Sequence, residues 1–378
     1  MSTITLSRRR FAHLLGAGAA AAVLKPAFSF PAEGVPSPAT GGVVRLSSNE
    51  NPYGPSAKAL EAMTKGFDLA CRYPDEHNDH LIESVAKTDG VNPDQILLGA
   101  GSGEILKLCA AAFTGAKAGR LVAADPTFEA ILKHANVAGA EVVKVPLTSS
   151  YAHDLGKMSA AAAKTGLVYI CNPNNPTASI TPKAELSDFI SDAPQQTMIL
   201  VDEAYFHFAD SPDYESVIPL IKDHPNLIVA RTFSKIYGMA GLRCGYCVAQ
   251  KETIDRLREH QPWDSVNILA LVAGVASMDD PEQVANGRRL NHEAKAFTLS
   301  ELDSLGYQSI ASQANFIMVD LKRPVVPLIA ALKQRNVQVG RLFPALPNHM
   351  RVTIGKREEM ETFLSAFRAI SASLLPAQ

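Results

Sequence analysis

The chain has 378 residues, of which 47% are hydrophobic and 20% charged, and its net charge is −2. These values exclude a disordered chain, and the lack of a basic excess argues against a nucleic-acid-binding protein. The length predicts two or more domains, or one large α/β domain with a smaller companion. Five cysteines in a chain of this length do not form a disulfide scaffold.

The first 32 residues have the pattern of a secretory leader. A basic cluster at Ser7 to Phe11 precedes an Ala/Gly-rich apolar run over residues 12–24 and a zone of small residues over 27–32. The paired arginines resemble a twin-arginine signal, and a frayed N-terminal helix is the alternative. We expect a leader over residues 1–32, a linker over 33–42, and export to the periplasm. Without a functional leader the protein is expected in the cytoplasm. The apolar run is too short for stable membrane insertion.

From residue 43 onward, short apolar runs alternate with longer amphipathic segments. Four runs have the length of strands and lack strict polar alternation, as buried parallel strands do: Arg120–Ala124, Leu167–Cys171, Met198–Val201 and Leu227–Ala230. Helical segments lie between them, and one is expected to begin at Pro182. This rhythm predicts an α/β fold with a large, doubly wound, mostly parallel sheet.

The C-terminal third has a different pattern. We expect a long helix over residues 283–305, strands near 316–319 and 351–354, a helix over 325–335 between them, and a final helix from Arg357. These elements predict a smaller α+β domain over residues 276–378. The segment 43–70 is expected to pack with it, and residues 71–275 are expected to form the large domain.

Polar, turn-rich segments follow three of the predicted strands, at a spacing of about 30 residues, which is one βαβ unit. They are Asn172–Thr177, Asp202–Tyr205 and Arg231–Lys235. In open parallel sheets, ligands bind beyond the carboxyl ends of the strands. We therefore expect the side chains of these segments to meet at one site.

The three segments offer an amide, a carboxylate, a phenol, a hydroxyl and an amine, from Asn175, Asp202, Tyr205, Ser234 and Lys235. A lysine in an apolar region is unfavourable unless it is paired or chemically used. Pyridoxal 5'-phosphate would use this set: its aldehyde needs a lysine, its pyridinium nitrogen an acid, and its phosphate hydroxyls, amides and a cation.

The chain also resembles a known family through these segments. Asn172-Pro-Asn-Asn-Pro-Thr177, Val201-Asp-Glu-Ala-Tyr205, Thr232-Phe-Ser-Lys235 and Gly241-Leu-Arg-Cys-Gly-Tyr246 resemble the fold-type I, class I/II aminotransferases. Three further segments narrow the resemblance to the histidinol-phosphate aminotransferase branch: Leu46-Ser-Ser-Asn-Glu-Asn-Pro-Tyr-Gly-Pro55, Arg72-Tyr-Pro74 and Met350-Arg-Val-Thr-Ile-Gly355. The resemblance extends from Leu46 to the end of the chain and implies a three-layer pyridoxal-phosphate transferase fold.

The resemblance implies roles for the residues around the cofactor. Lys235 would hold the cofactor as a Schiff base and shuttle protons, with its pKa depressed by a neighbouring cation such as Arg243. Asp202 would pair with the pyridinium nitrogen, and Asn175 and Tyr205 would bind the ring hydroxyl. Ser234 and Arg243 would bind the phosphate.

A glycine-rich turn before an apolar helix is a ready anion site. In Gly99-Ala-Gly-Ser-Gly-Glu104 we expect Gly101, Ser102 and Gly103 to contact the phosphate. Gly103 stands where family members often have Asp, so the contact there is assigned to the backbone and Ser102. Phe128 would stack on the pyridine ring, since stacking requires only a π-face.

The resemblance also implies substrate contacts. Arg351 would bind a carboxylate as a fork, and Asn49 would also contact the substrate. Arg341 is the candidate for a distal anionic group, although its spacing to Arg351 fits the family poorly and a surface ion pair is the alternative. Tyr73 would reach the cofactor phosphate of a neighbouring subunit, or merely pack; the first role implies a homodimer with composite sites. We expect no metal site, because Cys244-Gly-Tyr-Cys247 has no second Cys/His pair at metal-binding distance.

The leading hypothesis is a pyridoxal-phosphate-dependent aminotransferase. Its amino donor would be histidinol phosphate or an aromatic amino acid, and its acceptor a 2-oxo acid such as 2-oxoglutarate. A decarboxylase or lyase of an amino-acid phosphate on the same scaffold is the alternative, and a non-catalytic cofactor-binding protein is a third. Export and a cytoplasmic substrate conflict: either the donor is not histidinol phosphate or the leader is not functional.

Overall fold

The computed structural model describes residues 42–162 and 165–374. These residues belong to one compact unit that begins at Pro36. The predicted leader, and all of the predicted linker except its last residue, lie outside the described residues. The domain boundaries expected at residues 70 and 275 stay predictions.

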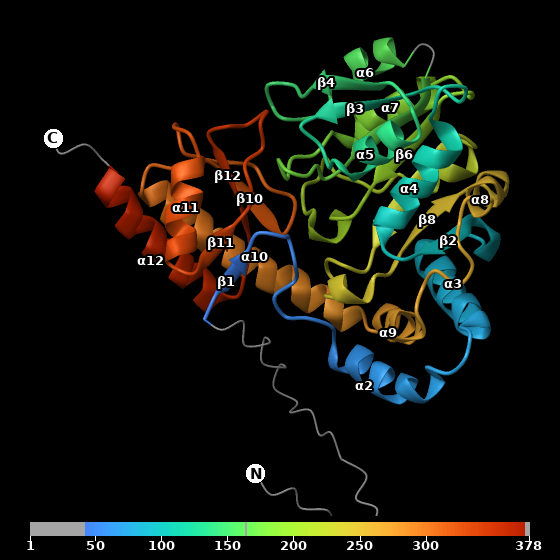
Figure 1. Cartoon of the computed structure of the whole chain (residues 1–378), viewed down its shortest axis with the longest axis horizontal. Coiled ribbons are helices and arrows are strands. Elements are labelled where there is room, and N and C mark those ends of the chain that lie inside the picture. Colours follow the sequence, from blue (N-terminus) through green and yellow to red (C-terminus); the bar gives the residue numbers. More distant parts are fainter. Residues whose placement is uncertain (1–41, 163–164, 375–378) are drawn as a thin grey trace, which may run out of the picture. The chain divides into compact units, whose positions relative to one another are not determined.

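A seven-stranded sheet carries the larger part of the chain (Figure 1), and its strand order is β2-β8-β7-β6-β5-β3-β4. The strands from β3 to β7 pair in parallel, whereas β8 runs antiparallel to both β2 and β7. The mostly parallel sheet confirms the predicted α/β class. The strands are β2 (Ile96–Gly99), β3 (Arg120–Asp125), β4 (Val142–Pro146), β5 (Thr165–Cys171), β6 (Met198–Asp202), β7 (Leu227–Thr232) and β8 (Gly245–Ala249). The four predicted strands are therefore confirmed within one or two residues at each end.

Both faces of this sheet are buried, because successive side chains of a strand point to opposite faces. In β5, Leu167 and Tyr169 belong to one apolar cluster, and Val168 and Ile170 belong to another. Helices cover the two clusters. The helices on the first face are α4 (Ser102–Phe113), α5 (Ala130–Val137) and α8 (Lys251–Arg258). Those on the second face are α2 (Ala57–Gly66), α3 (Asp75–Asp89), α6 (Leu155–Ala161), α7 (Lys183–Asp192) and α9 (Ile268–Met278).

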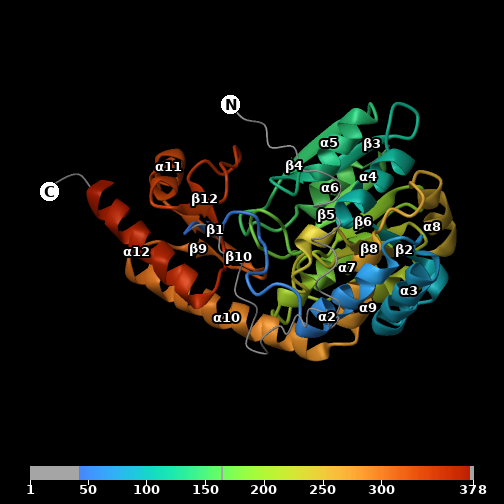
Figure 2. The ribbon, with the colours of Figure 1, turned by 60° about the horizontal axis from the view of Figure 1, so that its bottom comes forward.

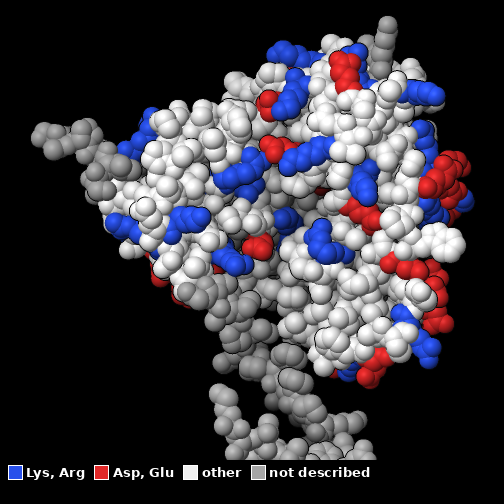
Figure 3. All heavy atoms as spheres, in the orientation of Figure 1, with Lys and Arg blue, Asp and Glu red and all other residues white. Residues whose placement is uncertain are grey.

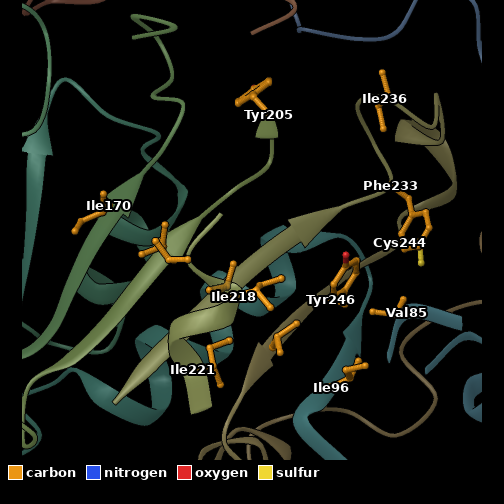
Figure 4. Close-up of a cluster of buried hydrophobic side chains, with 14 of the residues drawn as sticks. Val85, Ile96, Ile170, Tyr205, Ile218, Ile221, Phe233, Ile236, Cys244 and Tyr246 are labelled. Carbon is orange, nitrogen blue, oxygen red and sulfur yellow. The ribbon is translucent and has the colours of Figure 1, made fainter. Parts of the chain in front are cut away.

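Figure 4 shows part of the second cluster, with Phe233, Cys244 and Tyr246 gathered near Ile236 and Tyr205 just beyond the end of its strand. Phe233 and Tyr246 lie with their ring centroids 6.0 Å apart. Phe233 is directly followed by Ser234 and Lys235, so this packing anchors the segment that carries the predicted site residues.

The C-terminal third forms a third apolar cluster, separate from the two on the faces of the large sheet. The long helix α10 (Pro281–Ser304) leads into it, and the structure confirms the other predicted elements there. These are β10 (Phe316–Asp320), α11 (Val326–Gln334), β12 (His349–Thr353) and α12 (Arg357–Leu374). Two short strands that the sequence analysis did not predict are added: β9 (Ser309–Ile310) and β11 (Val337–Val339). The strands β12, β10 and β9 form an antiparallel sheet. Figure 2 shows α12 and α10 side by side.

The start of the described chain joins this C-terminal third. Strand β1 (Val44–Leu46) pairs in parallel with β11. Leu46 is fully buried in the same cluster as Val352 and Phe363. Figure 1 shows β1, in blue, among the orange and red elements. The residues that follow β1 are thereby fixed between the two groups of elements. No helix in residues 42–162 and 165–374 is long and apolar enough to cross a membrane.

Candidate active site

The carboxyl ends of β5, β6 and β7 bring the predicted residues together. Asp202 is the last residue of β6, Lys235 follows the end of β7 by three residues, and Asn175 follows β5 after a turn. These three strands are neighbours and run in parallel. Their carboxyl ends therefore lie at one edge of the sheet, as the sequence predicts.

Asp202 is a buried carboxylate that accepts hydrogen bonds from neutral groups. Tyr169 Oη donates to Oδ2 at 2.9 Å, and the backbone N–H of Ala204 donates to Oδ1 at 3.1 Å. Burial raises the pKa of Asp202 to about 6, although these hydrogen bonds act in the opposite direction. Among the described residues Asp202 has no ion-pair partner. A cationic ring nitrogen placed here would supply the missing charge.

Like Asp202, Lys235 is an ionisable side chain that is hydrogen-bonded to neutral groups, but its charged form is positive. Its Nζ donates to the backbone oxygens of Asn49 at 3.0 Å and Ser48 at 3.4 Å, and part of the side chain remains accessible. Burial of the amine, followed by the charge of Arg351, lowers the pKa of Lys235 to about 8. The sequence analysis named Arg243 as the cation responsible. The structure corrects this point, because desolvation dominates and the effect of Arg243 is the smallest of the five contributions.

Asn49, Asn175, Tyr205 and Arg351 form one hydrogen-bonded chain. Tyr205 Oη accepts from Asn49 Nδ2 at 3.0 Å and from Asn175 Nδ2 at 3.2 Å. Arg351 Nη1 donates to Asn175 Oδ1 at 2.7 Å. The amide groups are thus oriented from both sides, and Tyr205 keeps its own hydrogen as a donor. Burial raises the pKa of Tyr205, so the phenol stays protonated at neutral pH.

The glycine-rich turn lies against Arg243. Gly101 has φ +81° and precedes the first residue of α4, Ser102. A Cβ on Gly101 would lie 2.3 Å from Arg243 Nη2, so only glycine allows this approach. Arg243 Nη1 also lies 3.5 Å from Ser234 Oγ. In the first turn of α4, the N–H of Glu104 donates to the backbone oxygen of Gly101 at 3.0 Å, and those of Ser102 and Gly103 have no intrahelical acceptor. A guanidinium, a hydroxyl and a helix N-terminus therefore meet at one place, which is the donor set that a phosphate group requires. Gly103 has open space around its Cβ position.

Phe128 lies in the loop between β3 and α5 and is 38% exposed. Its neighbour Thr127 donates through Oγ1 to Asn174 Oδ1 at 2.9 Å, and Asn174 Nδ2 donates to the backbone oxygen of Pro126 at 3.1 Å. These bonds fix the loop against the turn that carries Asn175. The accessible ring of Phe128, on the loop that is bonded to this turn, is available for stacking on a ligand.

The two arginines of the C-terminal third differ in their surroundings. Arg351, on β12, is buried; its Nη2 donates to the backbone oxygen of Ser47 at 2.6 Å, and its Nε is buried without a partner among the described residues. Burial lowers the pKa of Arg351. Arg341 is half exposed and forms a 2.7 Å ion pair with Glu129. Both guanidinium groups lie over the ring of Phe343, with centroid distances of 5.1 Å and 4.4 Å.

Tyr73 is 79% exposed, and the single chain does not bring it to the other site residues. Within the part of the chain that the structure describes, no cluster of His, Cys, Asp and Glu has the geometry of a metal site. Figure 3 shows the face of the molecule seen in Figure 1, on which basic side chains are interspersed with acidic ones and surround the middle of the view.

The structure adds residues that sequence reasoning missed. Tyr169 donates to Asp202, Thr353 Oγ1 donates to Asn49 Oδ1 at 3.2 Å, and Asn315 Nδ2 donates to the backbone oxygen of Asn49 at 3.1 Å. A tyrosine in an apolar, fully buried strand was a usable signal for Tyr169, because a buried phenol needs a partner. Thr353 was within reach too, since it lies in the same segment as Arg351.

The residues present fit pyridoxal 5'-phosphate. The fit rests on three features. They are the turn at Gly101, where Arg243 occupies the space that a side chain would need, the buried carboxylate of Asp202 without an ion-pair partner among the described residues, and the amine of Lys235 with its lowered pKa. Each corresponds to one part of the cofactor: phosphate, ring nitrogen and aldehyde.

Known proteins agree with this geometry. A family profile for class I and II aminotransferases matches residues 41–367. The histidinol-phosphate aminotransferase of Moorella thermoacetica is 40% identical over 335 residues, which cover 87% of this chain and 86% of that protein. That of Symbiobacterium thermophilum is 39% identical over 329 residues, 86% of this chain and 90% of that protein.

Solved structures extend the comparison. The histidinol-phosphate aminotransferase of Sinorhizobium meliloti in complex with pyridoxal 5'-phosphate superposes with a TM-score of 0.82 at 25% identity, over 88% of this chain and 92% of that chain. The L-threonine-O-3-phosphate decarboxylase of Porphyromonas gingivalis, at 24% identity and a TM-score of 0.77 over 87% of this chain and 100% of that chain, shares the fold. The profile match over most of the chain and the arrangement around Lys235 lead to one conclusion: this chain belongs to the class I and II aminotransferases.

Proposed function

We propose that the protein is a pyridoxal-phosphate-dependent aminotransferase that takes the amino group of histidinol phosphate and transfers it to a 2-oxo acid such as 2-oxoglutarate. The observation that carries the proposal is the amine of Lys235, with a pKa of about 8, at the strand edge that also holds Asp202. The substrate follows from the names of the relatives, and an aromatic amino acid remains the second candidate donor.

When bound, the cofactor supplies an aldehyde that takes up the amino group and a ring that accepts electrons. Lys235 acts as nucleophile and proton carrier, because a fraction of its amine is neutral near pH 7. Asp202 holds a negative charge at the ring nitrogen. Asn175 and Tyr205 donate to the ring oxygen, while Arg243, Ser234 and the start of α4 hold the phosphate.

Substrate recognition is assigned to the two arginines. The fork of Arg351 binds the carboxylate of the 2-oxo acid. Arg341 binds the distal anion, which is the phosphate of histidinol phosphate or the second carboxylate of 2-oxoglutarate. One pair of arginines then serves both half-reactions.

Borohydride reduction of the holoenzyme, followed by peptide mapping, tests the central assignment. The cofactor should be locked onto the peptide that contains Lys235. Lys295 is a matched internal control, since it is also buried and its Nζ donates to the backbone oxygens of Ser312 and Ala314. Lys235→Ala should lower kcat by at least about 10³-fold, the range expected for loss of a positioned proton carrier. A label on Lys295, or full turnover by Lys235→Ala, contradicts the mechanism.

The donor is tested with a substrate panel of histidinol phosphate, histidinol, phenylalanine and tyrosine. Incubation with the donor alone should convert the cofactor to pyridoxamine phosphate in one stoichiometric turnover. Release of carbon dioxide from an amino-acid phosphate, with the cofactor unchanged, would instead show a decarboxylase on the same fold.

We also infer a homodimer with composite sites, in which Tyr73 reaches the cofactor phosphate of the other subunit. The large exposed surface of Tyr73 in the single chain supports this assignment. Sedimentation of the holoenzyme should give twice the mass of one chain, and Tyr73→Phe should weaken cofactor binding. A monomeric holoenzyme contradicts the inference.

Export by the leader is a separate proposal, supported by the arginine pair and apolar run in residues 1–32. Arg8→Lys combined with Arg9→Lys preserves charge and should abolish the periplasmic fraction. A periplasmic fraction that survives the double substitution contradicts the proposal. An enzyme found only in the cytoplasm before substitution also contradicts it, and there the donor assignment meets no conflict.

A further inference from the structure

The ion pair between Glu129 and Arg341 joins the loop after β3 to the loop after β11. Glu129 Oε2 lies 2.7 Å from Arg341 Nη2. Glu129 directly follows Phe128, the aromatic residue assigned to the cofactor ring, so its carboxylate stands at the carboxyl end of the large sheet. The partner guanidinium comes from the C-terminal third.

Arg341 is held next to the carboxylate-binding arginine. The backbone N–H of Gly340 donates to the backbone oxygen of Arg351 at 2.8 Å. The two guanidinium groups also share one ring, that of Phe343, which is itself buried. The positive charge of Arg341 is one of the influences that lower the pKa of Arg351, after burial. The two cations are therefore close enough to act on one bifunctional substrate.

Their counterions are not alike. Arg351 donates only to neutral oxygens, those of Asn175 and Ser47, so an incoming carboxylate meets no competing anion there. Arg341 already has a carboxylate in contact. A distal anion that approaches Arg341 must displace Glu129 or share the guanidinium with it, and it experiences the repulsion of a negative charge.

We propose that Glu129 is a specificity-determining residue: as the counterion of Arg341 it weakens the binding of substrates with a distal phosphate or carboxylate, and it leaves donors without such a group unaffected. The inference rests on the proposed function, in which Arg341 is the distal anion site. The pair has side-chain exposures of 54% and 40%. Exposed pairs contribute little, so Glu129 attenuates anion binding without preventing it.

A purely structural tether between the two loops makes a different prediction. Loss of a tether would change the affinity for all substrates by the same factor, since both loops border the whole site. Loss of a competing counterion changes only the affinity for anionic ligands. The ratio of two affinities therefore separates the two roles.

The experiment compares Glu129→Gln with Glu141→Gln as the matched control. Glu141 pairs with Arg120 at 3.2 Å, at the opposite end of the same strand β3. The dissociation constants of histidinol phosphate and histidinol are measured by calorimetry on borohydride-reduced holoenzyme, in which no turnover occurs. The ratio of kcat/KM values is measured on the active enzyme.

Glu129→Gln should tighten histidinol phosphate binding about two- to fivefold, the size of an exposed ion pair, and leave histidinol binding unchanged. Glu141→Gln should change neither ligand. Arg341→Gln should weaken histidinol phosphate binding, since it removes the cation of the distal site and leaves the charge of Glu129 unneutralised.

The role of Glu129 is overturned if its substitution changes both ligands equally, or if the control variant shows the same gain. An enzyme that transaminates none of the donors would overturn the proposed function instead. An active enzyme with an unchanged phosphate preference in Glu129→Gln overturns only the present inference.

Discussion

Asp202 and Glu203 are neighbours at the end of β6, yet they belong to two different polar clusters. Glu203 Oε2 accepts from Arg231 Nη2 at 2.7 Å and from Nε at 3.0 Å, and Arg231 Nη1 also donates to Asp89 Oδ1 at 2.6 Å. Asp202 has only a phenol and a backbone amide as donors. The carboxylates are adjacent in sequence, but the alternation of the strand directs them to opposite faces.

The difference separates structure from function. In the first cluster every charge contacts an opposite charge. Glu203 and Asp89 hold the pKa of Arg231 above its usual value although burial acts against it, and burial raises the pKa of Asp89 against the opposing effect of Arg231. In the second, Asp202 and Lys235 are both shifted toward their neutral forms by burial. Removing one partner of a buried ion pair destabilises a fold strongly, whereas unpaired buried groups with shifted pKa values are candidates for a reactive site.

The largest expected effect comes from breaking the paired cluster. Arg231→Gln leaves two buried carboxylates without their cation, which should lower the free energy of unfolding by about 3–5 kcal/mol at neutral pH. Folding then raises the carboxylate pKa values above their unfolded values, so the loss should diminish as the pH falls and these groups are protonated. Denaturant titrations at several pH values measure both effects.

Arg120→Gln is the control for that change, because it removes an exposed pair with Glu141 and should cost less than about 1 kcal/mol. Equal losses for the two arginine variants would contradict a special role for the buried cluster.

Asp202→Asn should lower the activity and raise the stability of the apoenzyme, whereas Arg231→Gln lowers the stability. It removes the negative charge from the ring partner, which should lower kcat about 10²–10³-fold. The folded pKa of Asp202, about 6, is above the unfolded value, so the charged carboxylate opposes folding at neutral pH. The apoenzyme should therefore become more stable, with a gain that appears as the pH rises through about 6. Thermal unfolding and steady-state kinetics are the measurements. An unstabilised apoenzyme that retains full activity would place the ring partner elsewhere.

The amine of Lys235 gives a prediction about pH. The neutral fraction of a group with a pKa of about 8 rises about tenfold between pH 7 and pH 9. The rate of cofactor uptake by the apoenzyme, followed by stopped-flow absorbance, should rise by that factor and level off above pH 9. Arg351→Gln should move the midpoint upward, because it removes a cation that lowers the pKa of Lys235. A rate that still rises steeply at pH 10 would indicate an ordinary lysine.

Tyr169→Phe should have the smallest effect on activity. It removes one of the two hydrogen bonds to Asp202, and a hydrogen bond contributes about 0.5–1.5 kcal/mol net. The kcat should therefore be about three- to tenfold lower. The acidic limb of the pH–rate profile should shift to higher pH, because this bond lowers the pKa of Asp202. Tyr246→Phe, at Asp89 in the paired cluster, is the control and should leave that limb in place.

The strand ends could be predicted from the sequence because they depend on local patterns. Apolar runs of strand length, each followed by a polar turn, are sufficient to predict Asn175, Asp202 and Lys235 at one edge of the sheet. The same reasoning did not reach Tyr169, since an apolar strand read as core conceals a phenol that points toward its neighbour's carboxylate.

The contacts made by the C-terminal third could not be derived in this way. The approach of Arg351 to Asn175, and the pairing of Arg341 with Glu129, depend on how two groups of elements pack. Sequence periodicity carries no information on that packing. The attribution of the lowered pKa of Lys235 to Arg243 was incomplete for the same reason: Arg243 does lower it, but the dominant effect is desolvation, which only the folded surroundings reveal.

The parallel pairing of β1 with β11 has a consequence for the order in which the protein is made. Residues 44–50 leave the ribosome near the beginning of synthesis, but the strand that receives β1, Val337–Val339, leaves near the end. The backbone oxygens that hold Lys235 and Arg351 belong to this early segment. Contacts between such distant parts of a chain form slowly. The large sheet can therefore assemble while translation continues, but the catalytic lysine acquires its final surroundings only when almost the whole chain has been released.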